Sequence, residues 1–269
     1  MRSDLTGKSH WDQVYAHAVC GERGGWQPTT YTEKSIEFFL MQAVQAVRPR
    51  NILEVGCGNS VWLPYLGQKT GAKVFGIDYS EEGCRLAKDN LVREGVTGEI
   101  ICGDIFELAA ADIGTFDLVY SLGLVEHFTS LTDILGRLAQ FAGPCGTVLT
   151  EVPNLYSVHG CLAGLYQPAL LSKHRTIRRS ELVKAYRDCG LDVSDHGYAG
   201  LFSFGIVAWG LDQRFPRLDA LILPVVRTLS KMTEKLLAKT AYQKGCSLLS
   251  PFLYVYGSKP SPRARGTSD

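Results

Sequence analysis

Short apolar runs alternate with amphipathic stretches through residues 33–152 of this chain. Runs of this length, rich in Ile, Leu, Val or Phe, suit strands of a parallel sheet that is buried on both faces. We predict such strands at residues 51–55, 73–77, 98–102, 116–120 and 146–152. Between them, apolar positions recur at helical spacing, and we predict helices at residues 33–47, 80–94 and 131–141. This alternation predicts an α/β fold with a doubly wound, mostly parallel sheet and right-handed crossovers.

Two polar residues mark the expected starts of these helices. Thr32 directly precedes the first helix, and Ser80 stands at the start of the second. The side chain of an N-cap residue accepts a hydrogen bond from a free backbone N–H of the first turn, so we predict both as N-caps. Pro49 is expected to end the first helix, because proline cannot continue the backbone hydrogen-bond pattern.

The sequence after residue 152 is less regular but contains three further elements. We predict a helix at residues 179–188, a sixth strand at 191–199 and a last strand at 253–256. With these strands the sheet becomes seven-stranded.

The remaining stretches define the expected domain organisation. Residues 153–178 and 201–249 are too long for turns, and we interpret them as helical insertions after the fifth and sixth strands. We expect an amino-terminal arm at residues 1–32 and one domain at 33–257. Residues 258–269 are rich in Pro, Ser and Arg, which predicts a disordered tail.

Composition and charge exclude several classes of protein. Lys and Arg total 28 against 27 Asp and Glu, so the formal net charge of +1 does not favour nucleic-acid binding. Eight cysteines without a C-x-x-C pair predict reduced thiols in a cytoplasmic protein. No apolar run opens the amino terminus, so no signal peptide is expected. The longest apolar region, residues 155–171, contains His159, Gln167 and Pro168, which argues against a spanning helix.

The first predicted strand runs into a glycine corner, GCG at residues 56–58. Glycines there let a ligand lie against the main chain, and the following helix directs free N–H groups toward it. Such a corner binds a nucleotide at the carboxyl end of a parallel sheet. A nicotinamide oxidoreductase would need a small residue at the third position of G-x-G-x-x-G, where this chain has Val61. The nucleotide is therefore not expected to be a dinucleotide.

Four short motifs resemble class I S-adenosylmethionine-dependent methyltransferases. They are LEVGCG at residues 53–58, FGIDYS at 75–80, GDI at 103–105 and FDLVYS at 116–121, and they follow in the order of that family. VEH at residues 125–127 is similar to the branch that includes ubiquinone and menaquinone methyltransferases. The resemblance implies S-adenosylmethionine as cofactor, with S-adenosylhomocysteine as its product.

The resemblance also implies a set of cofactor-binding residues. They are Glu54, Gly56, Cys57, Gly58, Asp78, Tyr79, Asp104, Ile105 and Ser121. Asp78, about 20 residues beyond the glycines, would accept bonds from both ribose hydroxyls, and Asp104 would accept one from the adenine amino group. Glu54 would steady the loop or approach the methionine ammonium group. Taken singly, Asp78 and Asp104 also read as a turn residue and a helix cap.

Three aromatic or basic side chains are candidates for the chemistry. His127 follows the fourth strand and would serve as a general base for a hydroxyl acceptor, or as a structural histidine. Trp11 and Tyr15, four residues apart, would form an aromatic lid over the cofactor or simply pack as a helix face.

The sequence around His127 bears on metal binding. Some quinone-pathway relatives are expected to use Glu-x-x-Glu-His as a metal site, whereas this chain has Gly123 in place of the first glutamate. The remaining pair, Glu126 and His127, supplies few oxygen ligands for magnesium, so no metal is expected.

The insertions should decide the substrate, because loops at the carboxyl ends of the strands form the pocket. Their Leu, Phe, Tyr and Trp content predicts a small lipophilic or aromatic acceptor, methylated on oxygen, with N- or C-methylation or an idle cofactor-binding module as alternatives. His159 and His174 are read as surface or packing histidines. Two basic groups would face solvent or make weak peripheral contact with an anionic membrane: Lys173, His174, Arg175, Arg178 and Arg179, and the stripe Arg227, Lys231, Lys235 and Lys239.

Overall fold

The computed structural model describes most of the chain. The described residues are 4–16, 18, 24–166, 171–201, 225, 228–229, 232–233, 236 and 245–261, with the side chains of residues 165–166 left out. The predicted basic stripe at residues 227–239, most of the insertion at 201–249 and the tail from residue 262 lie outside this part.

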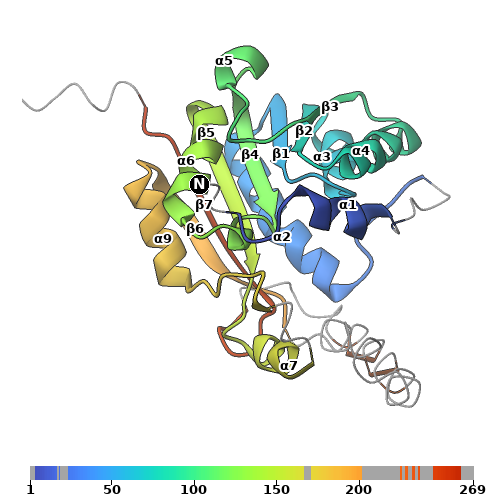
Figure 1. The fold of residues 1–269 in the computed structure, drawn as a ribbon, viewed down its shortest axis with the longest axis vertical. Coiled ribbons are helices and arrows are strands. Elements are labelled where there is room, and N and C mark those ends of the chain that lie inside the picture. Colours follow the sequence, from blue (N-terminus) through green and yellow to red (C-terminus); the bar gives the residue numbers. More distant parts are fainter. Residues whose placement is uncertain are drawn as a thin grey trace, which may run out of the picture.

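One seven-stranded sheet forms the centre of the described structure, in the order β3-β2-β1-β4-β5-β7-β6 (Figure 1). Its strands are β1 Asn51–Val55, β2 Lys73–Asp78, β3 Gly98–Cys102, β4 Phe116–Leu122, β5 Ala142–Pro153, β6 Asp192–Ala199 and β7 Phe252–Ser258. The neighbouring pairs among β1 to β5 are parallel, whereas β7 is antiparallel to both β5 and β6. The predicted α/β class with a mostly parallel sheet is confirmed.

Helices cover both faces of this sheet (Figure 1). The helices are α1 Lys8–Ala16, α2 Tyr31–Val47, α3 Trp62–Thr70, α4 Glu81–Glu94, α5 Ala110–Ile113, α6 Leu131–Phe141, α7 Val158–Tyr166 and α9 Arg179–Asp188, with a 3-10 turn at Val125–His127. Alternate residues of a strand point to opposite faces. Accordingly, Ile52 and Leu118 pack with α2, α3 and α4, whereas Leu53 and Val119 pack with α6 and α9. Two cores thus hold the sheet from either side.

The caps of the helices agree with the sequence at one position and differ at another. Ser80 caps α4 as predicted, since its hydroxyl accepts from the Gly83 N–H at 3.1 Å. The prediction for Thr32 is wrong, because α2 begins at Tyr31 and its N-cap is Thr30. Thr30 and Glu33 form a capping box in which each side chain accepts from the other's backbone N–H. That reciprocal pair requires a spacing of three residues, which Thr32 does not have with Glu33.

None of the described helices combines the length and the apolar character that crossing a membrane requires.

Candidate functional site

The glycine corner lies where β1 ends, beside the carboxyl end of β2. Gly56 and Gly58 have φ angles of 75° and 33°, in the left-handed region that favours glycine. A Cβ atom on Gly58 would collide with the hydroxyl of Tyr15, and one on Gly56 would come within 3.0 Å of the Leu124 side chain. Both glycines therefore permit close approach of another group to the main chain.

Asp78 joins the glycine corner to the start of α4. Its two carboxylate oxygens accept from the Gly58 N–H and the Ser80 N–H, each at 2.8 Å. Burial raises the pKa of Asp78, and the backbone hydrogen bonds from Ser80 and Gly58 oppose this shift. Each carboxylate oxygen can accept more than one hydrogen bond, so Asp78 can still bind ligand hydroxyls from this position.

A cavity of about 630 Å³ opens at these strand ends. It is lined by Asp4, Thr6, Trp11, Tyr15, Val55, Gly56, Ile77, Asp78, Tyr79, Gly103, Asp104, Ile105, Phe106, Leu122, Gly123, Leu124, His127, Phe128, Asp133 and Arg137. The structure therefore brings together eight of the residues singled out in the sequence, namely Trp11, Tyr15, Gly56, Asp78, Tyr79, Asp104, Ile105 and His127. The volume is in the range of small-molecule sites.

Four other predicted residues do not line the cavity: Glu54, Cys57, Gly58 and Ser121. Glu54 is buried and accepts from the hydroxyl of Tyr120, on the neighbouring strand β4, at 2.8 Å. Burial raises the pKa of Glu54 to about 8, against opposing hydrogen bonds from Ser60 and Tyr120. The Cys57 thiol lies in the core, and the Ser121 hydroxyl has no hydrogen-bond partner among the described residues.

The amino-terminal arm forms one wall of the cavity. Asp4 pairs with Phe128 in an isolated antiparallel bridge, and the Leu5 N–H donates to the His127 carbonyl at 2.8 Å. The Tyr79 hydroxyl donates to the Asp4 carboxylate at 3.0 Å. These bonds hold residues 4–5 across the carboxyl ends of β2 and β4.

Helix α1 continues this wall and carries the predicted aromatic pair. The Trp11 ring stacks on Tyr15 with ring centroids 5.8 Å apart and meets His127 edge-on at 5.1 Å. The Ser80 hydroxyl donates to Asp12 at 2.6 Å, and Lys8 forms an ion pair with Glu81, so α1 is fastened to the start of α4. Trp11 and Tyr15 therefore both line the cavity. Their four-residue spacing alone predicted only that they share a helix face.

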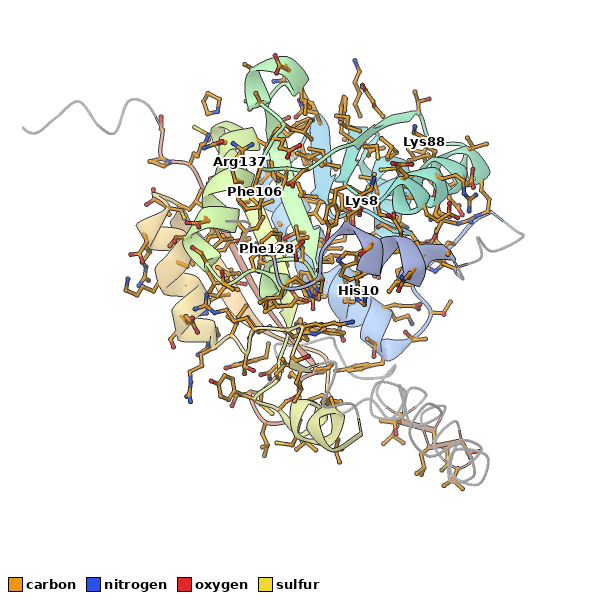
Figure 2. The ribbon with its side chains drawn as sticks, in the orientation of Figure 1. Lys8, His10, Lys88, Phe106, Phe128 and Arg137 are labelled. Atoms are coloured by element: carbon orange, nitrogen blue, oxygen red, sulfur yellow. The ribbon has the colours of Figure 1, made fainter. Side chains whose placement is uncertain are left out.

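The cavity is also lined by residues for which the sequence held no signal, among them Phe106, Phe128 and Arg137. Phe106 and Phe128 place their ring centroids 5.6 Å apart, and Arg137 of α6 donates from Nε to the Ile105 carbonyl at 3.0 Å (Figure 2). Arg137 also donates to the Leu108 carbonyl, which fixes the loop after β3. No sequence signal identified Arg137, because its partners lie about 30 residues away along the chain.

His127 ends the 3-10 turn after β4, where its ring orientation is fixed. Nδ1 lies 2.9 Å from the Lys173 carbonyl. Because a carbonyl only accepts, Nδ1 carries the hydrogen and Nε2 keeps its lone pair. Burial and the neighbouring His174 lower the pKa of His127 to about 4, so the imidazole is neutral near pH 7. His127 thus lines the cavity with an unprotonated Nε2, whose lowered pKa makes it a weaker base than an exposed histidine.

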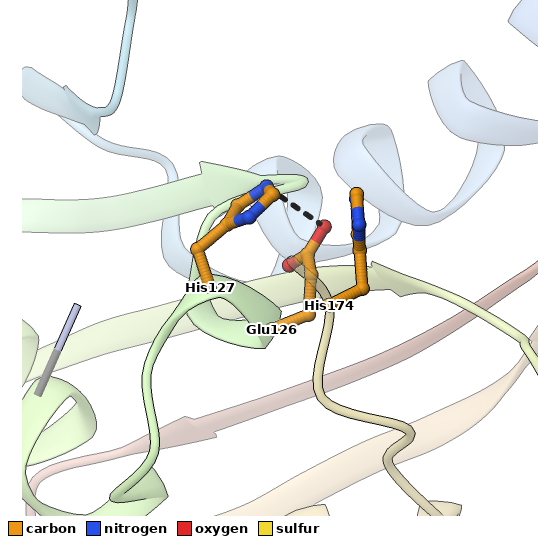
Figure 3. Close-up of side chains that lie close together, drawn as sticks. All are labelled: Glu126, His127 and His174. Atoms are coloured by element: carbon orange, nitrogen blue, oxygen red, sulfur yellow. Dashed lines mark ion pairs between the residues drawn. The ribbon is translucent and has the colours of Figure 1, made fainter. Parts of the chain in front are cut away.

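Two further titratable side chains lie beside His127 (Figure 3). Glu126 Oε1 is 3.9 Å from His127 Nε2, and the His174 ring centroid is 4.4 Å from that of His127. The nitrogen and oxygen atoms that Glu126, His127 and His174 offer to a metal ion lie within 4.8 Å of one another. The Glu126–His127 pair is therefore not isolated, and His174 is a site neighbour rather than a surface histidine.

The basic residues near His174 contact the protein itself. Lys173 Nζ lies 3.2 Å from His10 Nδ1, and Arg175 pairs with Glu181. The Arg178 and Arg179 guanidinium groups lie over aromatic rings, those of Tyr156 and Tyr198. The expected basic surface is thus partly used for internal contacts.

Comparisons with known sequences point to one family. The profile described as "Methyltransferase domain" matches residues 53–150. A ubiquinone biosynthesis O-methyltransferase of Bordetella avium (strain 197N) is 26% identical over 164 residues, which cover 58% of this chain and 68% of that protein. The enzyme of the same name from Nitrosococcus oceani is 28% identical over 155 residues, with coverages of 54% and 65%. The match thus spans about two thirds of these relatives.

Solved structures share the fold at low identity. The [4+2]-cyclase SpnF superposes with a TM-score of 0.63 and 13% identity and covers 97% of both chains. Coclaurine N-methyltransferase bound to N-methylheliamine and SAH superposes with a TM-score of 0.61 and 13% identity. The match covers 97% of this chain and 84% of that chain. A SAM dependent methyltransferase from Archaeoglobus fulgidus superposes with a TM-score of 0.54 and 16% identity. The match covers 84% of this chain and 94% of that chain. Because a cyclase and methyltransferases share it, the fold alone does not determine the reaction.

Proposed function

The chain contains a class I S-adenosylmethionine-dependent methyltransferase domain, and from this premise we propose that it methylates an oxygen atom of a small lipophilic or aromatic acceptor. One observation carries the proposal. Asp78, Asp104 and Ile105, the residues that should hold a nucleoside, line the same cavity as His127, the candidate base.

The residues of the cavity fit the cofactor. Asp78 would accept from the ribose hydroxyls while its existing bonds to Gly58 and Ser80 keep it in position. Asp104 would accept from the adenine amino group, with Tyr79 and Ile105 flanking the ring. Gly56, which lines the cavity, would let the amino-acid end lie close to the main chain. S-adenosylmethionine, when bound, supplies a methyl carbon that is already electrophilic because it is attached to a sulfonium.

The cavity walls favour a lipophilic acceptor. Phe106, Leu124, Phe128 and Trp11 all line the cavity, so an aromatic ring would meet apolar surfaces there. The relatives named ubiquinone biosynthesis O-methyltransferase support an oxygen acceptor on a quinone-type ring. Holding such a ring in line with the methyl group and excluding water would supply most of the rate.

His127 would take the proton from the acceptor hydroxyl. Its Nδ1–H donates to the Lys173 carbonyl, which leaves Nε2 as the basic atom. The Trp11 ring, edge-on to the imidazole, would restrict its rotation. In this role His127 lowers the barrier by binding the proton as the oxygen–methyl bond forms.

Two measurements test the proposal. Calorimetry should detect binding of S-adenosylmethionine and S-adenosylhomocysteine but not of NADH. Incubation with isotopically labelled S-adenosylmethionine and a panel of catechols, phenols and hydroquinones should label a product that mass spectrometry identifies as a methyl ether.

The outcomes separate the alternatives. A labelled N-methyl or C-methyl product would show that the acceptor atom is nitrogen or carbon and not oxygen. Cofactor binding without any labelled product, across oxygen, nitrogen and carbon acceptors, would favour an idle cofactor-binding module. Binding of NADH in place of S-adenosylmethionine would overturn the family-based function itself.

Weak contact with anionic membranes is a secondary proposal, which the exposed Arg178 supports within the described part of the chain. Sedimentation with phosphatidylserine vesicles would test it, with Lys231→Glu and Lys235→Glu as the reversing changes. Absence of the parent protein from the pellet would remove it.

A further inference from the structure

Three side chains of types that bind metal ions, from two distant segments, lie together beside the cavity: Glu126, His127 and His174 (Figure 3). Glu126 and His127 belong to the 3-10 turn after β4, and His174 belongs to the segment between α7 and α9. Their ligand atoms lie within 4.8 Å of one another, and His127 Nε2 is 3.9 Å from Glu126 Oε1. His127 also lines the cavity, which provides an entry path.

Backbone hydrogen bonds hold the two segments in this arrangement. The Lys173 carbonyl, next to His174, accepts from His127 Nδ1 at 2.9 Å. The Arg175 N–H, on the other side of His174, donates to the Glu126 carbonyl at 2.6 Å. Metal-ligating histidines commonly donate their second ring N–H to a carbonyl in this way, which orients the ligating nitrogen. The position of His174 is therefore fixed by bonds on both sides.

Buried carboxylate oxygens at this place lack partners among the described residues. Glu126 is 2% exposed, and its Oε2 accepts no hydrogen bond in the described part of the chain. Burial and the neighbouring Glu126 raise the pKa of Glu151, and its Oε1 likewise has no partner among the described residues. A buried acceptor without a partner costs free energy, and a bound cation would satisfy it.

We propose that Glu126, His127 and His174 bind one divalent transition-metal ion, with His174 supplying the ligand that Gly123 cannot. Two imidazole nitrogens and one carboxylate favour ions such as Zn²⁺, Co²⁺ or Mn²⁺ over Mg²⁺, which prefers oxygen ligands. Metal–ligand bonds of about 2.0–2.2 Å place ligand atoms roughly 3–4 Å apart, so closure by roughly 1 Å is needed at the widest pair.

This inference concerns the site of the proposed function and gives one atom a different role. His127 Nε2 cannot hold a metal ion and accept a proton at the same time. Metal binding would make His127 a ligand, and the base role assigned above would then not apply to the metal-bound protein.

The test is a titration of the full-length, metal-free protein with Co²⁺, followed by its visible absorption, and with Zn²⁺, followed by elemental analysis. One equivalent should bind, and Mg²⁺ in excess should not displace it. Glu126→Gln and His174→Gln should each weaken Co²⁺ binding by at least about 10- to 100-fold, because changing a group that merely orients a metal ligand already costs that much. His196→Gln, on β6, is the matched control and should bind as the parent does.

Thermal unfolding provides a second measurement that does not depend on turnover. Saturating Co²⁺ should raise the Tm of the parent and of His196→Gln but not that of Glu126→Gln or His174→Gln. A parent protein that binds no Co²⁺ or Zn²⁺, or variants that bind as tightly as the parent, would overturn the site. Calorimetry with S-adenosylmethionine on the same samples separates this result from the proposed function, because the nucleoside residues are unchanged.

Discussion

The glycine corner with Asp78 and the Glu126–His127–His174 cluster lie at the same edge of the sheet but differ in how their polar groups are satisfied. In the first region, both carboxylate oxygens of Asp78 accept backbone N–H groups. In the second, Glu126 Oε2 has no partner among the described residues, although the residue is equally buried. Both oxygens of Asp78 are thus already partnered and held in place before a ligand binds, whereas Glu126 has an oxygen with no partner among the described residues.

The difference predicts which property, cofactor binding or turnover, a substitution in each region should change. A residue that supports the main chain of the glycine corner affects binding through the geometry of the loop. A residue of the cluster affects chemistry with little effect on nucleoside binding. Four substitutions test this division of roles, beginning with the largest expected effect.

His127→Gln should reduce turnover most, while cofactor affinity stays within a few-fold of the parent. Loss of a positioned base typically costs about 10²- to 10⁴-fold in rate. Rapid-quench measurement of kcat with a saturating acceptor, alongside calorimetry with S-adenosylmethionine, separates the two quantities. His10→Gln changes a histidine that also contacts Trp11 but does not line the cavity, and it should retain turnover. Equal rates for the parent and His127→Gln would reject the base role.

Asp78→Ala should show the opposite division, with loss of cofactor affinity as the primary effect. Removing a charged acceptor leaves the buried N–H groups of Gly58 and Ser80 unpaired, and we expect binding to weaken by roughly 10- to 100-fold. Asp89→Ala, on the exposed face of α4, is the control. Unchanged affinity in Asp78→Ala would mean that the nucleoside binds elsewhere.

Glu54→Gln should change how stability depends on pH. The unfolded chain ionises Glu54 near its ordinary pKa of 4.5, whereas burial keeps it protonated in the folded state up to a pKa of about 8. Folding therefore loses stability as the pH rises from about 4.5 to 8, by at most a few kcal/mol, roughly 1.4 per pKa unit.

Glutamine has no such titration and keeps a carbonyl for the Tyr120 hydroxyl. Urea unfolding at pH 5.5 and 8.5 should give the free energy of unfolding of the parent and of Glu54→Gln. Relative to the parent, the variant should be more stable at pH 8.5 than it is at pH 5.5. A constant difference would contradict the raised pKa.

Trp11→Ala should have the smallest effect, a reduction of several-fold in cofactor affinity. The ring stacks on Tyr15 and borders the cavity, and one aromatic contact contributes about 0.5–1.5 kcal/mol. Val14→Ala, on an exposed position of α1, is the control. Identical affinities in calorimetry would leave Trp11 with a packing role only.

The fold was largely predictable because its elements depend on local patterns. The helices at residues 131–141 and 179–188 have their predicted bounds, and the parallel strands begin within a few residues of prediction. Apolar runs and the carboxylate about 20 residues after the glycines lie in one stretch of sequence. Asp78 could therefore be connected to the glycine corner without knowledge of the structure.

The site was less predictable where contacts join distant segments. His174 reaches His127 through Lys173, 46 residues away along the chain, and periodicity contains no information on such a contact. Glu54 belongs to a recognisable motif, but the alternation of a strand turns it toward Tyr120, away from the cavity that its neighbour Val55 lines. Sequence patterns identified the residue types, and tertiary packing determined which of them line the cavity.

The bridge between Asp4 and Phe128 makes the arm part of the binding site for any ligand of the cavity. A nucleoside touching Tyr79 and Trp11 would strengthen the docking of residues 4–16, and docking would strengthen the nucleoside's binding by the same factor. A dissociation constant measured for such a nucleoside would then include the free energy of docking the arm. Protection of the arm from proteolysis should increase in step with cofactor saturation.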